Sequence, residues 1–157
     1  MPAAFIGEVK TLWLKEEGPD RRMTLIESFA FVDPNGKRWD APAGHVIDGA
    51  SIPQFLWSLA GSPYIGDYRR ASVLHDVACD AKTEPSKAVH RMFYDAMICD
   101  GVSEPQALEF YTAVRLFGPS WTMQTGGAKG IFITKATARP VRTIQQVEDA
   151  LDAVLAE

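Results

Sequence analysis

The first third of the chain has the hydrophobic pattern of short strands. Residues 4–14 and 23–32 are rich in β-branched and aromatic side chains, which favour extended backbone. The run 33–36 is Asp-Pro-Asn-Gly, a turn signal, because proline presets φ and Asn-Gly tolerates positive φ. We expect one short strand to follow through Trp39 and a last one at 45–47. These strands should pair in an antiparallel manner.

After residue 52 the apolar positions recur at helical spacing. The pattern predicts a short helix over 53–60 and longer helices over 67–80 and 84–100. A further helix should run from Ser103 to Gly118. For the helix over 67–80 we expect an N-cap at Asp67.

The C-terminal part is less regular until its last helix. Residues 119–130 resemble a loop, and 131–134 could form a strand. Thr143 and Gln146 have the spacing of a capping box, which opens a final amphipathic helix, and Ser103 with Gln106 has the same spacing. Strands first and helices after predict an α+β fold. We expect a single domain over 1–157, with a β-rich part over 1–50, a helical part over 52–118, and a loop or strand with the C-terminal helix over 119–157.

The most distinctive chemistry lies in the two central helices. The helices over 67–80 and 84–100 are joined by few residues and should therefore pack antiparallel. With the turn near residue 83, His75 and His90 lie opposite each other, offset by about 3 Å along the axis at a rise of ~1.5 Å per residue. Asp76 directly follows His75. We predict His75, Asp76 and His90 as catalytic residues and metal ligands, with Asp48 as an optional further carboxylate ligand.

Each candidate also has a structural interpretation. A histidine on an apolar stripe is often a core residue whose hydrogen bonds are satisfied by its neighbours. Asp76 could be solvated or pair with Arg69 or Arg70, and Asp48 could cap the helix that follows it. Cys79, one turn after the first histidine of the pair, favours core packing over metal ligation.

Other ionisable side chains and cysteines on these helices suggest no chemistry. We expect Asp80 and Asp95 to be surface charges. A disulfide between Cys79 and Cys99 is excluded by the hairpin geometry, which sets them ~16 Å apart along the axis, beyond the ~7 Å limit for the Cα atoms.

Composition narrows the classes of function. The chain has 157 residues, is 46% hydrophobic and 23% charged, and carries a net charge of −4 without a basic run, which disfavours nucleic-acid binding. No apolar run approaches the ~18 residues of a transmembrane helix, and the N-terminus lacks the pattern of a signal peptide. Two cysteines do not form a disulfide framework, so we expect a reducing compartment.

Three segments together resemble a known family: PAGHVIDGASIPQFLW, then YRRASVLHD, then AVHRMFYDAM. They are similar to the phage and prophage family catalogued as domain of unknown function 1353, over about residues 25–118. The resemblance implies a location in the host cytoplasm or the phage particle, with other phage structural proteins as partners. The chain departs from the family pattern at Cys79, where a tyrosine is expected, and at His90, where an aspartate is expected.

A more distant local resemblance is to the His-Asp helices of phospholipase A2 enzymes. It implies that His75 is a general base, Asp76 a calcium ligand and His90 the group that orients the base. A neutral His90 cannot stabilise an imidazolium as a carboxylate does. Imidazole nitrogens favour zinc, so zinc suits these residues better than calcium does.

Two functions follow from these observations. The first is a metal-dependent hydrolase, in which a zinc or calcium ion activates a water for attack on an ester. The second is a non-catalytic phage virion or assembly component, in which the His-Asp pair is a buried structural network.

Overall fold

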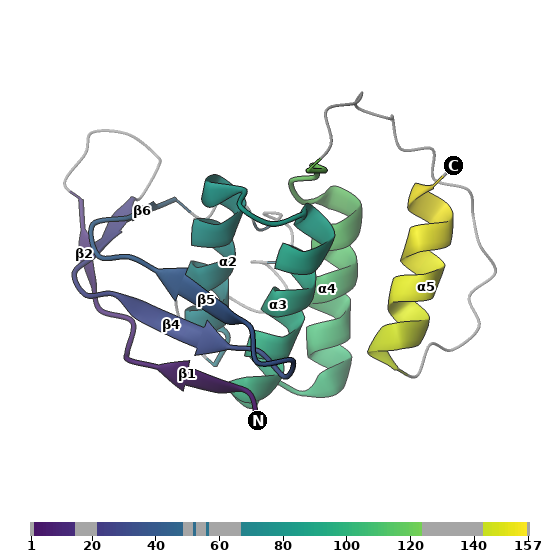
Figure 1. Ribbon diagram of the computed structural model, residues 1–157, viewed down its shortest axis with the longest axis horizontal. Coiled ribbons are helices and arrows are strands. Elements are labelled where there is room, and N and C mark those ends of the chain that lie inside the picture. Colours follow the sequence, from purple (N-terminus) through teal and green to yellow (C-terminus); the bar gives the residue numbers. More distant parts are fainter. Residues whose placement is uncertain are drawn as a thin grey trace.

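The computed structural model describes residues 2–14, 22–48, 52, 56, 67–123 and 143–156. Of the helix expected over 53–60 only Leu56 is among these described residues, and the strand expected over 131–134 lies outside them. Within them the order of elements is strands first and helices after, which confirms the predicted α+β fold (Figure 1). The strands are β1 (Ala4–Ile6), β2 (Thr11–Trp13), β3 (Met23–Leu25), β4 (Phe29–Val32), β5 (Arg38–Ala41) and β6 (Val46–Ile47).

These strands form two small antiparallel sheets, ordered β1-β4-β5 and β2-β3-β6. Each long strand expected over 4–14 and 23–32 is divided into two, and its halves belong to different sheets. The register nevertheless continues across the division, since Ala4 pairs with Val32 and Thr11 pairs with Leu25. The two runs are therefore one antiparallel ribbon that bends between the sheets.

The bend falls at Gly7, which has φ +85° and follows β1 directly. Only glycine adopts this backbone region without strain. The predicted turn is also present: the Gly36 amide donates to the Asp33 carbonyl, and the Asp33 side chain accepts hydrogen bonds from two further amides and from the Trp39 indole. This buried carboxylate fixes the approach to β5.

Four helices follow within the described residues: α2 (Arg69–Ala81), α3 (Ser86–Cys99), α4 (Glu104–Phe117) and α5 (Ile144–Leu155). Helices α2 and α3 form the predicted hairpin, and β5 and β6 contact α2 while β1 contacts α3. Helix α4 packs on α3, and α5 packs on α4. Figure 1 shows this succession, with the strands on one flank of the hairpin and α5 farthest from them.

The helix ends agree with the predicted signals in part. The capping box of Thr143 and Gln146 is present at the start of α5. Ser103 is the N-cap of α4, but its side chain makes no capping hydrogen bond. The N-cap of α2 is Tyr68 rather than Asp67, so the expected cap at Asp67 is wrong by one residue.

The core lies between the strands and the helix hairpin. Its largest fully buried side chains come from both layers and from α4, among them Phe31, Leu74, Phe93, Met97 and Tyr111. His75 is buried among them with no exposed surface.

One expectation about charge is wrong. Asp95 is not a surface charge, since it is only 8% exposed. Arg91, one turn earlier on α3, donates a hydrogen bond to its carboxylate and so compensates for its burial. Burial raises the pKa of Asp95, and Arg91 partly offsets that rise. Asp80 is exposed as expected and pairs with His45.

Candidate metal centre

Two histidines meet at the middle of the helix hairpin. His75 lies on α2 and His90 on α3, and the Nε2 atom of His75 is 2.8 Å from the Nδ1 atom of His90. Their ring centroids are 5.1 Å apart. The antiparallel packing of helices joined by a short turn brings them together, as the sequence spacing predicts.

Cys79 completes a group of three metal-binding side chains. It lies one turn after His75 on α2, and its Sγ atom is 3.6 Å from the Nε2 atom of His75. One ligand atom from each of His75, Cys79 and His90 lies within 4.8 Å of the others, so this group could hold a metal ion. We call these three residues the cluster. The spacing of four residues between His75 and Cys79 is the signal in the sequence for this role, although the sequence favours core packing for Cys79.

The hydrogen bonds of His90 determine which of its nitrogens faces the group. Its Nε2 atom lies 2.9 Å from the carbonyl oxygen of Pro119. A carbonyl oxygen only accepts, so Nε2 carries the proton and donates it. In the neutral ring Nδ1 then has a free lone pair, directed at His75. Without a metal, the Nε2–H of His75 donates to that lone pair.

Burial keeps both rings neutral. His75 is fully buried and His90 is 2% exposed. Burial lowers the pKa of His75 well below its ordinary value, and His90 lowers it further. Burial lowers the pKa of His90 to about 4, although its bond to Pro119 acts in the opposite direction. Neutral imidazole is the form that binds metals, so both side chains are ready to act as ligands at neutral pH.

The predicted carboxylate candidates, Asp76 and Asp48, make a contact of their own. Asp76 is 3% exposed, and its Oδ2 atom accepts a hydrogen bond from the backbone amide of Asp48 at 3.2 Å. Asp76 therefore fastens the end of β6 to α2, and the Asp48 residue is exposed. Neither residue belongs to the group of three ligands that the described part of the chain contains.

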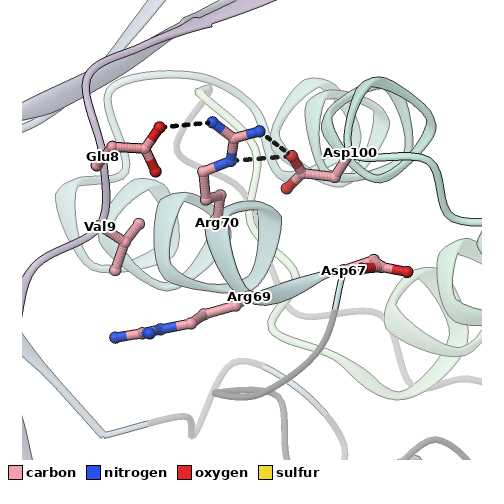
Figure 2. Close-up of a pocket in the computed structure, with 6 residues that line it drawn as sticks. All are labelled: Glu8, Val9, Asp67, Arg69, Arg70 and Asp100. Atoms are coloured by element: carbon pink, nitrogen blue, oxygen red, sulfur yellow. Dashed lines mark hydrogen bonds and ion pairs between the residues drawn. The ribbon is translucent and has the colours of Figure 1, made fainter.

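A second polar feature lies near the start of α2. It is a pocket of about 350 Å³ that none of the three cluster residues lines. Figure 2 shows that Arg70 links Asp100 and Glu8 across it. The pocket is lined by Glu8, Val9, Asp67, Arg69, Arg70 and Asp100. The Oδ2 atom of Asp100 and the Nε atom of Arg69 are buried there without a hydrogen-bond partner among the described residues.

The fold and the cluster define the class: an α+β domain with a buried His-Cys-His group in a helix hairpin. The chain belongs to the family described as "Protein of unknown function (DUF1353)", which matches residues 23–114. That segment contains the whole cluster, whereas Pro119 lies just beyond it.

The chain is also similar to two proteins of Sinorhizobium fredii (strain NBRC 101917 / NGR234). It is 46% identical over 101 residues to "Uncharacterized protein y4jT", covering 64% of this chain and 30% of that protein. It is 42% identical over 105 residues to "Uncharacterized protein y4iH", covering 67% of this chain and 44% of that protein. The chain thus spans less than half the length of these relatives. No solved structure shows significant similarity to it.

Among the described residues, none of the helices has the length and apolar character that crossing a bilayer requires.

Proposed function

We propose that the protein is a zinc-dependent, hydrolase-like domain with His75, Cys79 and His90 as the zinc ligands. The observation that carries the proposal is the convergence of their ligand atoms within 4.8 Å. In this role the ion would lie between Nε2 of His75, Sγ of Cys79 and Nδ1 of His90.

The distances between the ligand atoms support tetrahedral zinc. Bond lengths of ~2.0 Å to nitrogen and ~2.3 Å to sulfur imply separations of ~3.5 Å between nitrogen and sulfur and ~3.3 Å between two nitrogens. The observed separation between Cys79 and the Nε2 atom of His75 is 3.6 Å, which fits. The two imidazole nitrogens, 2.8 Å apart, would have to separate by about 0.5 Å. Zinc would then replace the proton that the two rings share.

The chemistry of the donors favours zinc over calcium. Two imidazole nitrogens and a thiolate sulfur suit zinc, whereas calcium takes six to eight oxygen ligands. Asp76, the calcium ligand that the resemblance to phospholipase A2 implies, would be a single oxygen donor beside these nitrogen and sulfur donors. In the structure it accepts a hydrogen bond from the amide of Asp48.

The number of ligands supports catalysis rather than a purely structural ion. Structural zinc sites usually have four protein ligands, whereas catalytic sites have three and leave a position for water. The described residues supply three. A zinc ion held by His75, Cys79 and His90 would supply a Lewis acid that lowers the pKa of a water molecule, and this chemistry would support hydrolysis of an ester to a carboxylic acid and an alcohol. Asp48 and Asp76 as additional ligands, and a phage or prophage origin, stay predictions.

A specific observation favours the second candidate function. Without a metal, the cluster forms a complete chain in which His75 donates to His90 and His90 donates to Pro119. Buried polar groups that satisfy one another in this way fix the packing of a core. In a non-catalytic virion or assembly component, these linked hydrogen bonds would hold α2 and α3 in register.

The metal content of the purified full chain decides between the two functions. Purification would use neither a chelator nor a metal-affinity step, and zinc would be measured by mass spectrometry. The matched variants are Cys79→Ser and Cys99→Ser, since neither cysteine is in a disulfide but only Cys79 belongs to the cluster. We expect about one zinc per chain in the wild type and in Cys99→Ser, and loss of it in Cys79→Ser.

Hydrolysis of simple aryl esters, with and without added zinc, then tests catalysis. If the wild type contains no zinc and takes up none when zinc is added, the structural function of the hydrogen bonds from His75 to His90 and from His90 to Pro119 is the better explanation of the cluster. Bound zinc without any ester hydrolysis would reject the hydrolase and keep the metal site.

A further inference from the structure

The segment that follows α4 is fastened to the start of α3 by its backbone and by one indole ring. We name residues 119–121 the clamp. Trp121 donates its backbone N–H to the Ser86 hydroxyl at 3.1 Å, and that hydroxyl donates to the Trp121 carbonyl at 2.9 Å. The indole Nε1–H of Trp121 donates to the carbonyl of Glu84 at 2.8 Å. The clamp is therefore held at two points, Ser86 at the start of α3 and Glu84 two residues before that helix.

These bonds determine the position of one carbonyl at the metal centre. Pro119, two residues before Trp121, presents its carbonyl oxygen to Nε2 of His90 at 2.9 Å. Ser86 and His90 are four residues apart on α3 and so lie on the same face of that helix. The Trp121 ring meets the His90 ring edge-on, with centroids 6.3 Å apart.

The path of the chain into the clamp is equally constrained. Gly118 ends α4, and a Cβ atom at this position would lie 2.5 Å from the carbonyl oxygen of Val114. Only glycine allows this close approach, which turns the chain toward α3. The clamp thus has a fixed origin on α4 and fixed contacts on α3.

We propose that Ser86 and Trp121 are positioning residues that select the tautomer of His90 and thereby its metal-binding nitrogen. The clamp presents an acceptor to Nε2, which keeps the proton there and leaves Nδ1 free to face His75 and Cys79. A backbone carbonyl commonly orients a ligating histidine in this way, and loss of such a partner weakens metal binding by about 10–100-fold. The metal part of this inference rests on the proposed function. Trp121 lies outside the segment that matches the family.

The test uses Ser86→Ala and Trp121→Phe in the full chain. The first variant removes the hydroxyl that bonds to the Trp121 backbone, and the second keeps an aromatic ring but removes its N–H donor. The control is Ser72→Ala on α2, because the Ser72 hydroxyl is buried without a partner among the described residues. Zinc affinity is measured by competition with a chromophoric chelator. We expect binding about 10–100-fold weaker in both test variants and unchanged in the control.

A second measurement, on metal-free protein, reads the tautomer directly from the ¹⁵N chemical shifts of the His90 ring. We expect a single Nε2–H form in the wild type and the control, and a mixture of both tautomers in the test variants. Unchanged tautomers in both test variants would overturn the inference, even if zinc binding weakened. If the wild type bound no zinc but the tautomer still shifted, the proposed function would fail and the action of the clamp on His90 would be supported.

Discussion

At the scale of single residues, the properties of the cluster depend on two imidazoles that the fold keeps uncharged. His75 and His90 are almost completely removed from water, and the described residues give them neutral partners, a carbonyl oxygen and each other. Protonating either ring would place a charge in the core, which costs free energy. This cost links the stability of the protein to pH.

Acidification should therefore destabilise the metal-free protein. The pKa of His90 is about 4 in the folded state, below the ordinary 6.5 that applies after unfolding. The unfolded chain thus binds more protons between these values. The contribution is fully present above pH 6.5 and is lost as the pH falls toward 4, by about 3 kcal/mol for His90. His75 acts in the same direction. Urea denaturation over this pH range measures the loss.

The control for this prediction is His90→Asn, which has no titrating group at that position. Its stability should depend less steeply on pH than that of the wild type. Asp95 and Asp100, whose pKa values burial raises, act in the opposite direction but are present in both proteins. Equal slopes for the two proteins would contradict the prediction.

The sequence allowed the histidine pair to be predicted because the register of a short hairpin is a matter of counting residues. The bond from His90 to Pro119 could not be predicted in this way. It depends on where the chain travels after α4, and no local pattern specifies that path. The structural role of Asp76 likewise depends on a tertiary contact, with the amide of Asp48.

At the scale of elements, α5 is held by buried polar contacts as well as by apolar ones. Glu148, 7% exposed, accepts hydrogen bonds from Tyr111 on α4 and Arg91 on α3. Asp152 pairs with Arg115 and Lys87. The buried apolar side chains of this helix are Val147 and Leu151.

Substituting Glu148→Gln should therefore loosen α5. An uncharged amide leaves Arg91 without one of its two carboxylate partners, and a buried charged hydrogen bond contributes about 1–3 kcal/mol. We expect a loss of that size in the free energy of unfolding, measured by urea denaturation. The control is Asp149→Asn on the exposed side of the same helix, with a change within about 0.5 kcal/mol. Similar effects of both substitutions would argue against a docking role for Glu148.

The bend between the two sheets has its own test. Gly7→Ala should destabilise the fold by about 1–3 kcal/mol, because φ +85° is strained for a residue with a side chain. Its new Cβ atom would also lie 3.4 Å from the Cβ atom of Phe29. Gly44→Ala is a matched control, with φ +84° and no atom of the described residues within 4 Å of the new methyl group. Thermal unfolding should show a loss at both positions that is at least as large at Gly7 as at Gly44, and an unchanged Tm in Gly7→Ala would contradict the prediction.

The strands and helices could largely be predicted from the sequence, whereas the bend that divides the long strands could not. Residues 4–14 have a continuous composition of strand-forming side chains, and the bend appears only when β1 and β2 pair in different sheets. The helices could be predicted because their apolar residues recur at helical spacing. Their exact N-caps depended on local backbone geometry, as Tyr68 shows.

At the scale of the whole molecule, the cluster lies where the layers meet. Helix α2 contacts β5 and β6, while α3 contacts β1 and α4. A metal that joined α2 to α3 would therefore connect parts of the core that separate on unfolding. The family match over residues 23–114 contains this hairpin and β3 to β6, whereas α5 lies beyond it.

Zinc should consequently stabilise the entire fold. A ligand that binds only the folded state adds about 2.7 kcal/mol when its concentration is 100 times the Kd, which raises Tm by roughly 5–10 °C in a chain of this size. Differential scanning calorimetry of the metal-free protein, with and without zinc, measures the shift. Calcium should give none, because nitrogen and sulfur are poor ligands for it. Cys79→Ser should lose most of the zinc response, whereas Cys99→Ser should keep it. An equal zinc response in these two variants would place the ion away from the hairpin, because only Cys79 lies within reach of the paired histidines.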